Sequence, residues 1–109
     1  MNSTEIQVLR DISKNPCISQ REIASRNGVS LGKVNYVIRS LVDKGHVKVR
    51  NFRKLENKKG YMYLLTPNGV AAKARLTVEY LRRKMEEYEK LQRELDELKQ
   101  ELSKPGEIS

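Results

Sequence analysis

The C-terminal part of the chain contains no helix-breaking residue between Gly69 and Pro105. Thr66 can cap a helix at its start, and Pro67 suits the first helical position. The sequence therefore predicts one helix from residue 67 to about Ser103, which is unusually long for a globular domain. In a chain of 109 residues, this leaves room for one small head domain,.

Apolar residues recur along this predicted helix with heptad-like spacing. Lys84 interrupts the pattern, and Met85 beside it can compensate. Glutamates line one flank and Gln92 and Lys99 the other, as in helix pairs with charged margins. We therefore expect a homodimer through a seam of Leu81, Met85, Tyr88, Leu91, Leu95, Leu98 and Leu102. A single helix packed on its own head is less favoured, because residues 81–102 would extend about 30 Å, which is beyond a head of this size. Parallel and antiparallel pairing both remain open.

Charge is distributed unevenly along the chain, whose net charge is +8. Residues 1–75 contain 15 Lys and Arg against 5 Asp and Glu, whereas residues 76–109 contain 7 against 9. A strongly basic body attracts a polyanion such as nucleic acid. The alternative is that the charge serves solubility alone.

Several classes of protein have no support in the sequence. No apolar run approaches the roughly 18 residues of a membrane span, and no signal-peptide pattern begins the chain. Cys17 is the single cysteine, which rules out an intramolecular disulfide and fits a reducing compartment,. It is expected to be a small apolar filler, and His46 a structural residue. No zinc spacing, phosphate loop or catalytic set is present, so we expect a cytoplasmic, non-enzymatic protein without metal or cofactor.

The first half of the chain has the pattern of three short helices. The first is expected from about Thr4 to Lys14, with Ile6, Leu9 and Ile12 inward. The second starts at a capping box of Ser19 and Glu22 and ends at Asn27-Gly28, with Ile23 and Ala24 inward. The third runs from the cap Ser30 to Lys44-Gly45, with an inward side of Val34, Ile38, Leu41 and Val42, and Val37 near its edge. Two helices joined by so short a Gly-containing turn predict a helix-turn-helix.

The apolar period then changes from helical to two. Residues 46–50 alternate as a half-buried strand does, and residues 61–65 form a second β-prone run. Residues 54–60 between them are a polar turn. A hairpin with a basic tip directly after a helix-turn-helix predicts a wing.

The outward side of the third helix has the side chains that major-groove reading requires. Lys33 and Arg39 can donate to guanine or phosphate, and Asn35 can make paired hydrogen bonds to adenine. Tyr36 can pack on a thymine methyl or reach a phosphate, and Gly32 allows close approach. The alternative is an ordinary solvated face.

Two further groups are expected to contact DNA. The start of the second helix presents a hydroxyl, an amide and free backbone N–H groups to a phosphate, from Ser19, Gln20 and Arg21. Wing cations can follow the backbone or enter the minor groove. These cations are Arg50, Arg53, Lys54, Lys58 and Lys59. Capping by Ser19 and solvation of the wing are the structural alternatives.

Three segments carry a family resemblance: ISQREIASRNGVSLGKVNYVIRSLVDKGHVKVRNF, GYMYLLTPNG and KARLTVEYLRRKMEEYEKL. From about Leu9 to Leu98 the chain resembles MarR-family transcriptional regulators associated with exopolysaccharide gene clusters. The resemblance implies a bacterial winged-helix regulator of such genes. It places Ser30, Lys33, Asn35, Tyr36 and Arg39 on the recognition helix and residues 50–59 in the wing.

The sequence departs from the broader MarR pattern at its start. Typical members are longer, and their N-terminal helix joins the dimer interface. Here only about three residues precede the first helix, so the walls of the phenolic-ligand pocket are largely missing. A small-molecule effector is therefore not expected.

The combined prediction is a mainly α protein with a small β-hairpin. A winged helix-turn-helix head (1–66) precedes one long C-terminal dimerisation helix (67–103) and a flexible tail (104–109). The predicted function is sequence-specific binding of double-stranded DNA by a homodimer, with half-sites about 10 bp or a multiple apart. The alternatives are a winged-helix protein-interaction adaptor and a double-stranded RNA binder.

Overall fold

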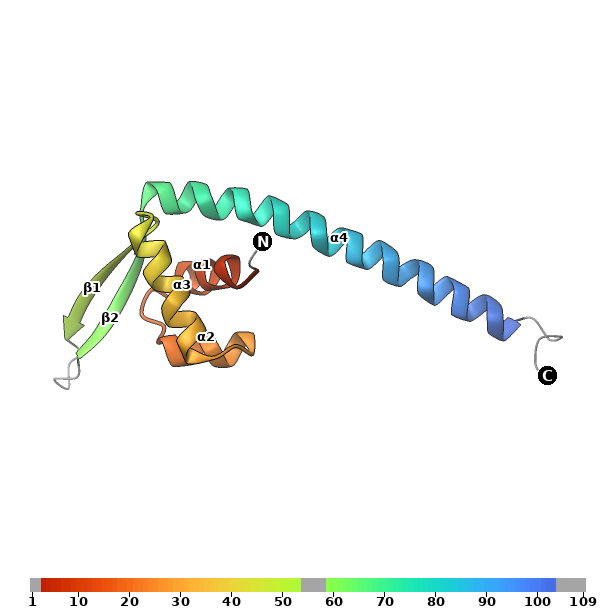
Figure 1. Cartoon of the computed structure of the whole chain (residues 1–109), viewed down its shortest axis with the longest axis horizontal. Helices are drawn as coiled ribbons and strands as arrows, with labels where there is room; N and C mark the ends of the chain where they lie inside the picture. Colours follow the sequence, from red (N-terminus) through yellow and green to blue (C-terminus); the bar gives the residue numbers. More distant parts are fainter. Residues whose placement is uncertain (1–2, 54–58, 104–109) are drawn as a thin grey trace. The chain divides into compact units, whose positions relative to one another are not determined.

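The computed structural model describes residues 3–53 and 59–103 (Figure 1). The elements are α1 (Ser3–Lys14), α2 (Gln20–Asn27), α3 (Leu31–Asp43), β1 (Val47–Arg53), β2 (Lys59–Leu65) and α4 (Pro67–Ser103). This order confirms the predicted fold class, mainly α with one small antiparallel hairpin and a long final helix.

Contacts divide the chain into two compact units, and the division lies inside α4. The first unit, Met1–Thr77, is called the head below; the second begins at Val78 and is called the tail. The start of α4 belongs to the head because Ala72 is buried and Leu76 packs against the core.

The core of the head lies among α1, α2, α3 and the hairpin. Its largest fully buried side chains are Ile6, Val8, Leu9, Ile12, Ile23, Val34 and Leu41. On α3 the buried stripe also includes Val37 and Ile38, whereas Val42 is 38% exposed. The prediction that Val42 points inward is wrong, because Val42 lies at the edge of the stripe and borders an open depression between α3 and the hairpin.

The predicted helix ends are confirmed by their capping bonds. Ser19 Oγ accepts from the Glu22 amide at 3.0 Å, and Ser30 Oγ accepts from the Lys33 amide at 3.1 Å. Gly28 ends α2 with a φ of +63°, a left-handed conformation that side chains disfavour,. The turn between α2 and α3 is therefore as short as the sequence indicated.

The hairpin is longer than predicted, since β1 extends to Arg53 and β2 begins at Lys59. Val49 pairs with Tyr63, and Val47 with Leu65. The Tyr63 amide also donates to Pro16 O at 2.8 Å, which ties the linker before α2 to the hairpin. Cys17 in this linker is exposed, so the expectation of a buried filler is wrong.

A tight corner joins the end of the hairpin to α4. The Thr66 amide donates to His46 O, and Thr66 Oγ1 accepts from the Gly69 amide. A Cβ at Gly69 would lie 1.9 Å from His46 O. Only glycine fits here unless the backbone carbonyl of His46 moves. The first turn of α4 therefore packs directly against the backbone that precedes β1.

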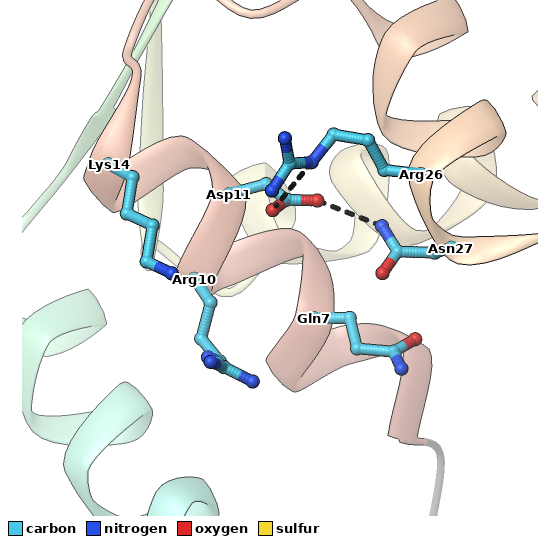
Figure 2. A pocket seen from close by; sticks show the side chains of 6 residues that line it. All are labelled: Gln7, Arg10, Asp11, Lys14, Arg26 and Asn27. Atoms are coloured by element: carbon cyan, nitrogen blue, oxygen red, sulfur yellow. Dashed lines mark hydrogen bonds and ion pairs between the residues drawn. The ribbon is translucent and has the colours of Figure 1, made fainter.

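A polar contact holds α1 to α2 on another side of the head (Figure 2). Asp11 Oδ2 accepts from Asn27 Nδ2 at 2.8 Å, and Asp11 Oδ1 lies 3.5 Å from Arg26 Nε. Asp11 is buried, so these partners compensate for its desolvation,. They line a depression of about 260 Å³ together with Gln7, Arg10 and Lys14.

Candidate nucleic-acid interface

The outer side of α3 carries the predicted side chains in exposed positions. Lys33, Asn35 and Arg39 are exposed, and Tyr36 is 72% exposed. The buried stripe on the opposite side fixes this orientation. A Cβ at Gly32 would meet nothing within 4 Å, so the head itself does not require a glycine there.

The start of α2 presents its three predicted residues differently. Ser19 and Arg21 are exposed, and Ser19 also caps the helix. Gln20 is partly buried, and both ends of its amide face protein atoms. Its Nε2 donates to Tyr63 OH at 3.1 Å, and its Oε1 accepts from Asn35 Nδ2 at 3.3 Å. Sequence reasoning missed this use of Gln20.

Part of the predicted wing lies among the described residues. Arg50 is exposed on β1 and pairs with Met62 across the hairpin. Arg53 and Lys59 face each other as backbone partners in the two strands. Lys54 and Lys58 lie outside the described residues.

An open depression separates α3 from the hairpin and has a volume of about 490 Å³. It is lined by Gln20, Asn35, Ile38, Arg39, Val42, Asp43, Val49, Tyr61 and Tyr63. It brings Asn35 and Arg39 beside two tyrosines that the sequence analysis did not select. The alternation of the second strand could have identified these two tyrosines, because a period of two places Tyr61 and Tyr63 on one face.

The tail leaves its predicted seam uncovered. Each of the seven residues of the predicted seam is between 47% and 88% exposed. They are Leu81, Met85, Tyr88, Leu91, Leu95, Leu98 and Leu102. A shallow, mostly apolar groove of about 350 Å³ begins this side, lined by Val78, Leu81, Arg82, Met85, Glu86 and Glu89.

Lys84 interrupts the seam and has its own partners within the tail. Its Nζ donates to Glu87 Oε2 at 3.2 Å and lies 5.4 Å from the centre of the Tyr80 ring. The hydrogen bond to Glu87 and the charge of that carboxylate raise the pKa of Lys84 above its usual value. Lys84 therefore keeps its charge to a higher pH than a free lysine does, and its side of the ion pair is lost as the pH rises through this elevated pKa,.

Residues 3–53 and 59–103 contain neither a candidate metal site nor a candidate membrane span. No group of three or more His, Cys, Asp or Glu side chains there is placed to hold a metal ion. None of the helices in that part of the chain has the length and apolar character needed to cross a bilayer.

Comparisons with known proteins agree with this geometry. Residues 1–48 match the family described as winged helix-turn-helix DNA-binding. No curated protein matches the chain.

Solved structures of transcriptional regulators share the fold. The Mycobacterium tuberculosis MarR family protein Rv2887, in complex with salicylic acid, is 24% identical with a TM-score of 0.67, over 94% of this chain and 77% of that one. The Streptomyces coelicolor regulator PcaV, with its natural ligand, is 20% identical with a TM-score of 0.67, over 94% and 74%. The Sulfolobus solfataricus regulator BldR is 23% identical with a TM-score of 0.63, over 94% and 74%. The domain match indicates a winged helix-turn-helix DNA-binding head, and the chain has the winged-helix fold of these solved MarR-family regulators.

Proposed function

We propose that the chain is a sequence-specific regulator that binds double-stranded DNA as a homodimer, with α3 in the major groove. The observation that carries this proposal is the outer side of α3, where Lys33, Tyr36 and Arg39 are exposed together. The predicted interaction adaptor would require an apolar, uncharged face at this place. Duplex RNA is disfavoured because its deep, narrow major groove excludes a helix.

The tail supports the homodimer part of the proposal. A row of exposed apolar side chains on one helix gains free energy only when another surface covers it. A second copy offers a matching row with the same spacing. The dimer would then place two heads on one operator.

The proposed target genes follow from the sequence resemblance alone, and the proposed location follows from the single cysteine and the DNA-binding head,. They would be exopolysaccharide genes of a bacterium, and the protein would act in the cytoplasm. Rv2887 was solved with salicylic acid and PcaV with its natural ligand, but no effector is proposed for this chain.

The decisive experiment is selection of bound fragments from a duplex library at two salt concentrations, followed by affinity measurements on the selected duplex. Non-specific phosphate binding falls steeply with salt, so fragments retained at the higher concentration report specific binding. Lys33→Ala combined with Arg39→Ala is expected to raise the Kd about 100-fold, because each base or phosphate contact contributes about 1–3 kcal/mol.

A matched control removes the same charge elsewhere. Arg10 and Lys14 are exposed cations on α1, outside the proposed interface. Replacing both by alanine is expected to change the Kd only a few-fold. Equal losses in the two double variants would show that net charge alone drives binding and would reject the role of α3.

Gly32 gives a second test, in which stability and binding move in opposite directions. Gly32→Ala should stabilise the head by about 0.5–1 kcal/mol, because alanine is the better helix former and has free space,. The added methyl should weaken binding to the selected duplex if α3 approaches DNA closely. Unchanged binding would contradict close approach at this position.

A further inference from the structure

Three polar side chains from different elements form one hydrogen-bond network behind the outer side of α3. Tyr63 OH accepts from Gln20 Nε2 at 3.1 Å, and Gln20 Oε1 accepts from Asn35 Nδ2 at 3.3 Å. Tyr63 on β2 is 4% exposed, Gln20 on α2 is partly buried, and Asn35 on α3 is exposed. The network therefore runs from the core to the surface.

The bonds in this network leave the outer end of Asn35 available. A side-chain amide has two N–H donors and one carbonyl acceptor. The bond to Gln20 uses one N–H of Asn35, so Oδ1 and the second N–H remain. This is the donor and acceptor pair that makes bidentate hydrogen bonds to adenine in the major groove.

We propose that Tyr63, acting through Gln20, is a positioning residue that holds the Asn35 amide in the orientation needed to read a base edge. The inference rests on the proposed function, and it assigns a part in base recognition to two residues that need not touch a base. The end torsion of an asparagine side chain is soft, so an unsupported exposed amide samples many orientations. Fixing it beforehand reduces the entropy that binding costs.

The surroundings of Tyr63 support this role. Its ring belongs to the core cluster, and packing alone would be met equally well by phenylalanine. The hydroxyl instead points to Gln20, and both residues line the depression beside Asn35 and Arg39. A buried tyrosine hydroxyl needs a polar partner, and here that partner is the group that fixes Asn35.

The test begins with Tyr63→Phe, which removes one hydroxyl and keeps the ring. Binding is measured to the duplex selected by the wild-type protein and to duplexes with each base pair changed in turn. The variant is expected to lose about 5- to 10-fold of the preference at one base pair, the size of one hydrogen bond. Binding to unrelated DNA and the salt slope should not change.

A double-mutant cycle then connects the effect to Asn35. Asn35→Ala should lose preference at the same base pair, and adding Tyr63→Phe should cost nothing more. Gln20→Leu, which keeps the size but removes both bonds, should behave like Tyr63→Phe and carries the test if that variant does not fold. Tyr80→Phe in the tail makes the same chemical change outside the head and serves as the control.

Nuclear magnetic resonance of the protein alone gives a second readout. The Asn35 side-chain amide should be restricted on the nanosecond timescale in the wild type and more mobile in Tyr63→Phe and Gln20→Leu. Unchanged mobility, or an equal loss of affinity for all duplexes, would show a merely structural role and overturn the inference. If the wild type prefers no sequence at all, the proposed function itself fails.

Discussion

The head and the tail differ in how far their apolar side chains are buried. In the head, residues from α1, α2, α3 and the hairpin bury one another, and the exposed side of α3 is mainly polar. In the tail, the apolar residues of the seam are all exposed. A helix in water gains most of its stability from packing one face, so the head has a source of stability within the chain that the tail lacks. The difference shows that the head has a core of its own, and it is the basis for the proposal that the tail is an assembly element.

The largest expected effect comes from replacing one leucine in the head and comparing it with the same replacement in the tail. Leu41→Ala should lower the free energy of unfolding of the head by about 3 kcal/mol, because it leaves a cavity in a closed core,. Leu95→Ala should leave the unfolding of the head unchanged when measured on dilute, monomeric protein. Urea denaturation of both variants is the measurement. A comparable loss in Leu95→Ala would break the comparison.

The second prediction tests whether the tail is an assembly element. Leu95→Asp puts a carboxylate into the proposed seam of both copies, where burying it carries a desolvation cost. The dimer Kd should rise at least about 100-fold, equivalent to ~2.7 kcal/mol. Sedimentation velocity should then show monomers whose heads have the circular dichroism of the wild type. A dimer that persists would mean that the interface lies elsewhere.

The third prediction compares a polar contact of the head with one of the tail. Asp11→Ala should destabilise the head by about 1–3 kcal/mol, since it removes the acceptor that Asn27 and Arg26 share and leaves the Asn27 amide with Ile23 O alone,. Glu87→Ala removes the exposed carboxylate beside Lys84 and should leave the melting temperature of the head unchanged,. Thermal unfolding at low protein concentration measures both.

The smallest expected effect tests whether a capping bond at a helix end stabilises the head. Ser30→Ala should cost about 1 kcal/mol, because the Lys33 amide loses its capping oxygen,. Ser25→Ala, an exposed position inside α2, should be neutral or slightly stabilising,. If the two serine variants melt at the same temperature, the cap at Ser30 contributes little to the fold.

Local features of the head were readable from the sequence. Ser19, Gly28 and Ser30 define helix ends through neighbours only a few residues away, and periodicity placed Tyr36 and Arg39 outside. Val42 shows the limit of this reasoning, because whether an apolar residue at a stripe's edge is covered depends on what packs there. Which residues touch DNA stays a prediction.

Contacts between distant residues were not readable. Gln20 and Tyr63 are 43 positions apart, and no local pattern says that their side chains meet. The need for glycine at position 69 likewise depends on where the carbonyl of His46 lies in space. Both features arise from the placement of the hairpin, which a one-dimensional pattern does not contain.

The position of the division inside α4 has a practical consequence for protein engineering. A fragment truncated at Thr66 would discard Ala72 and Leu76 and so open a hole beneath the remaining helices. A fragment ending at Thr77 retains Ala72, Leu76 and the rest of the core. Chimeras joined at Val78 would exchange the tail for another helix and leave every buried residue of the head in place.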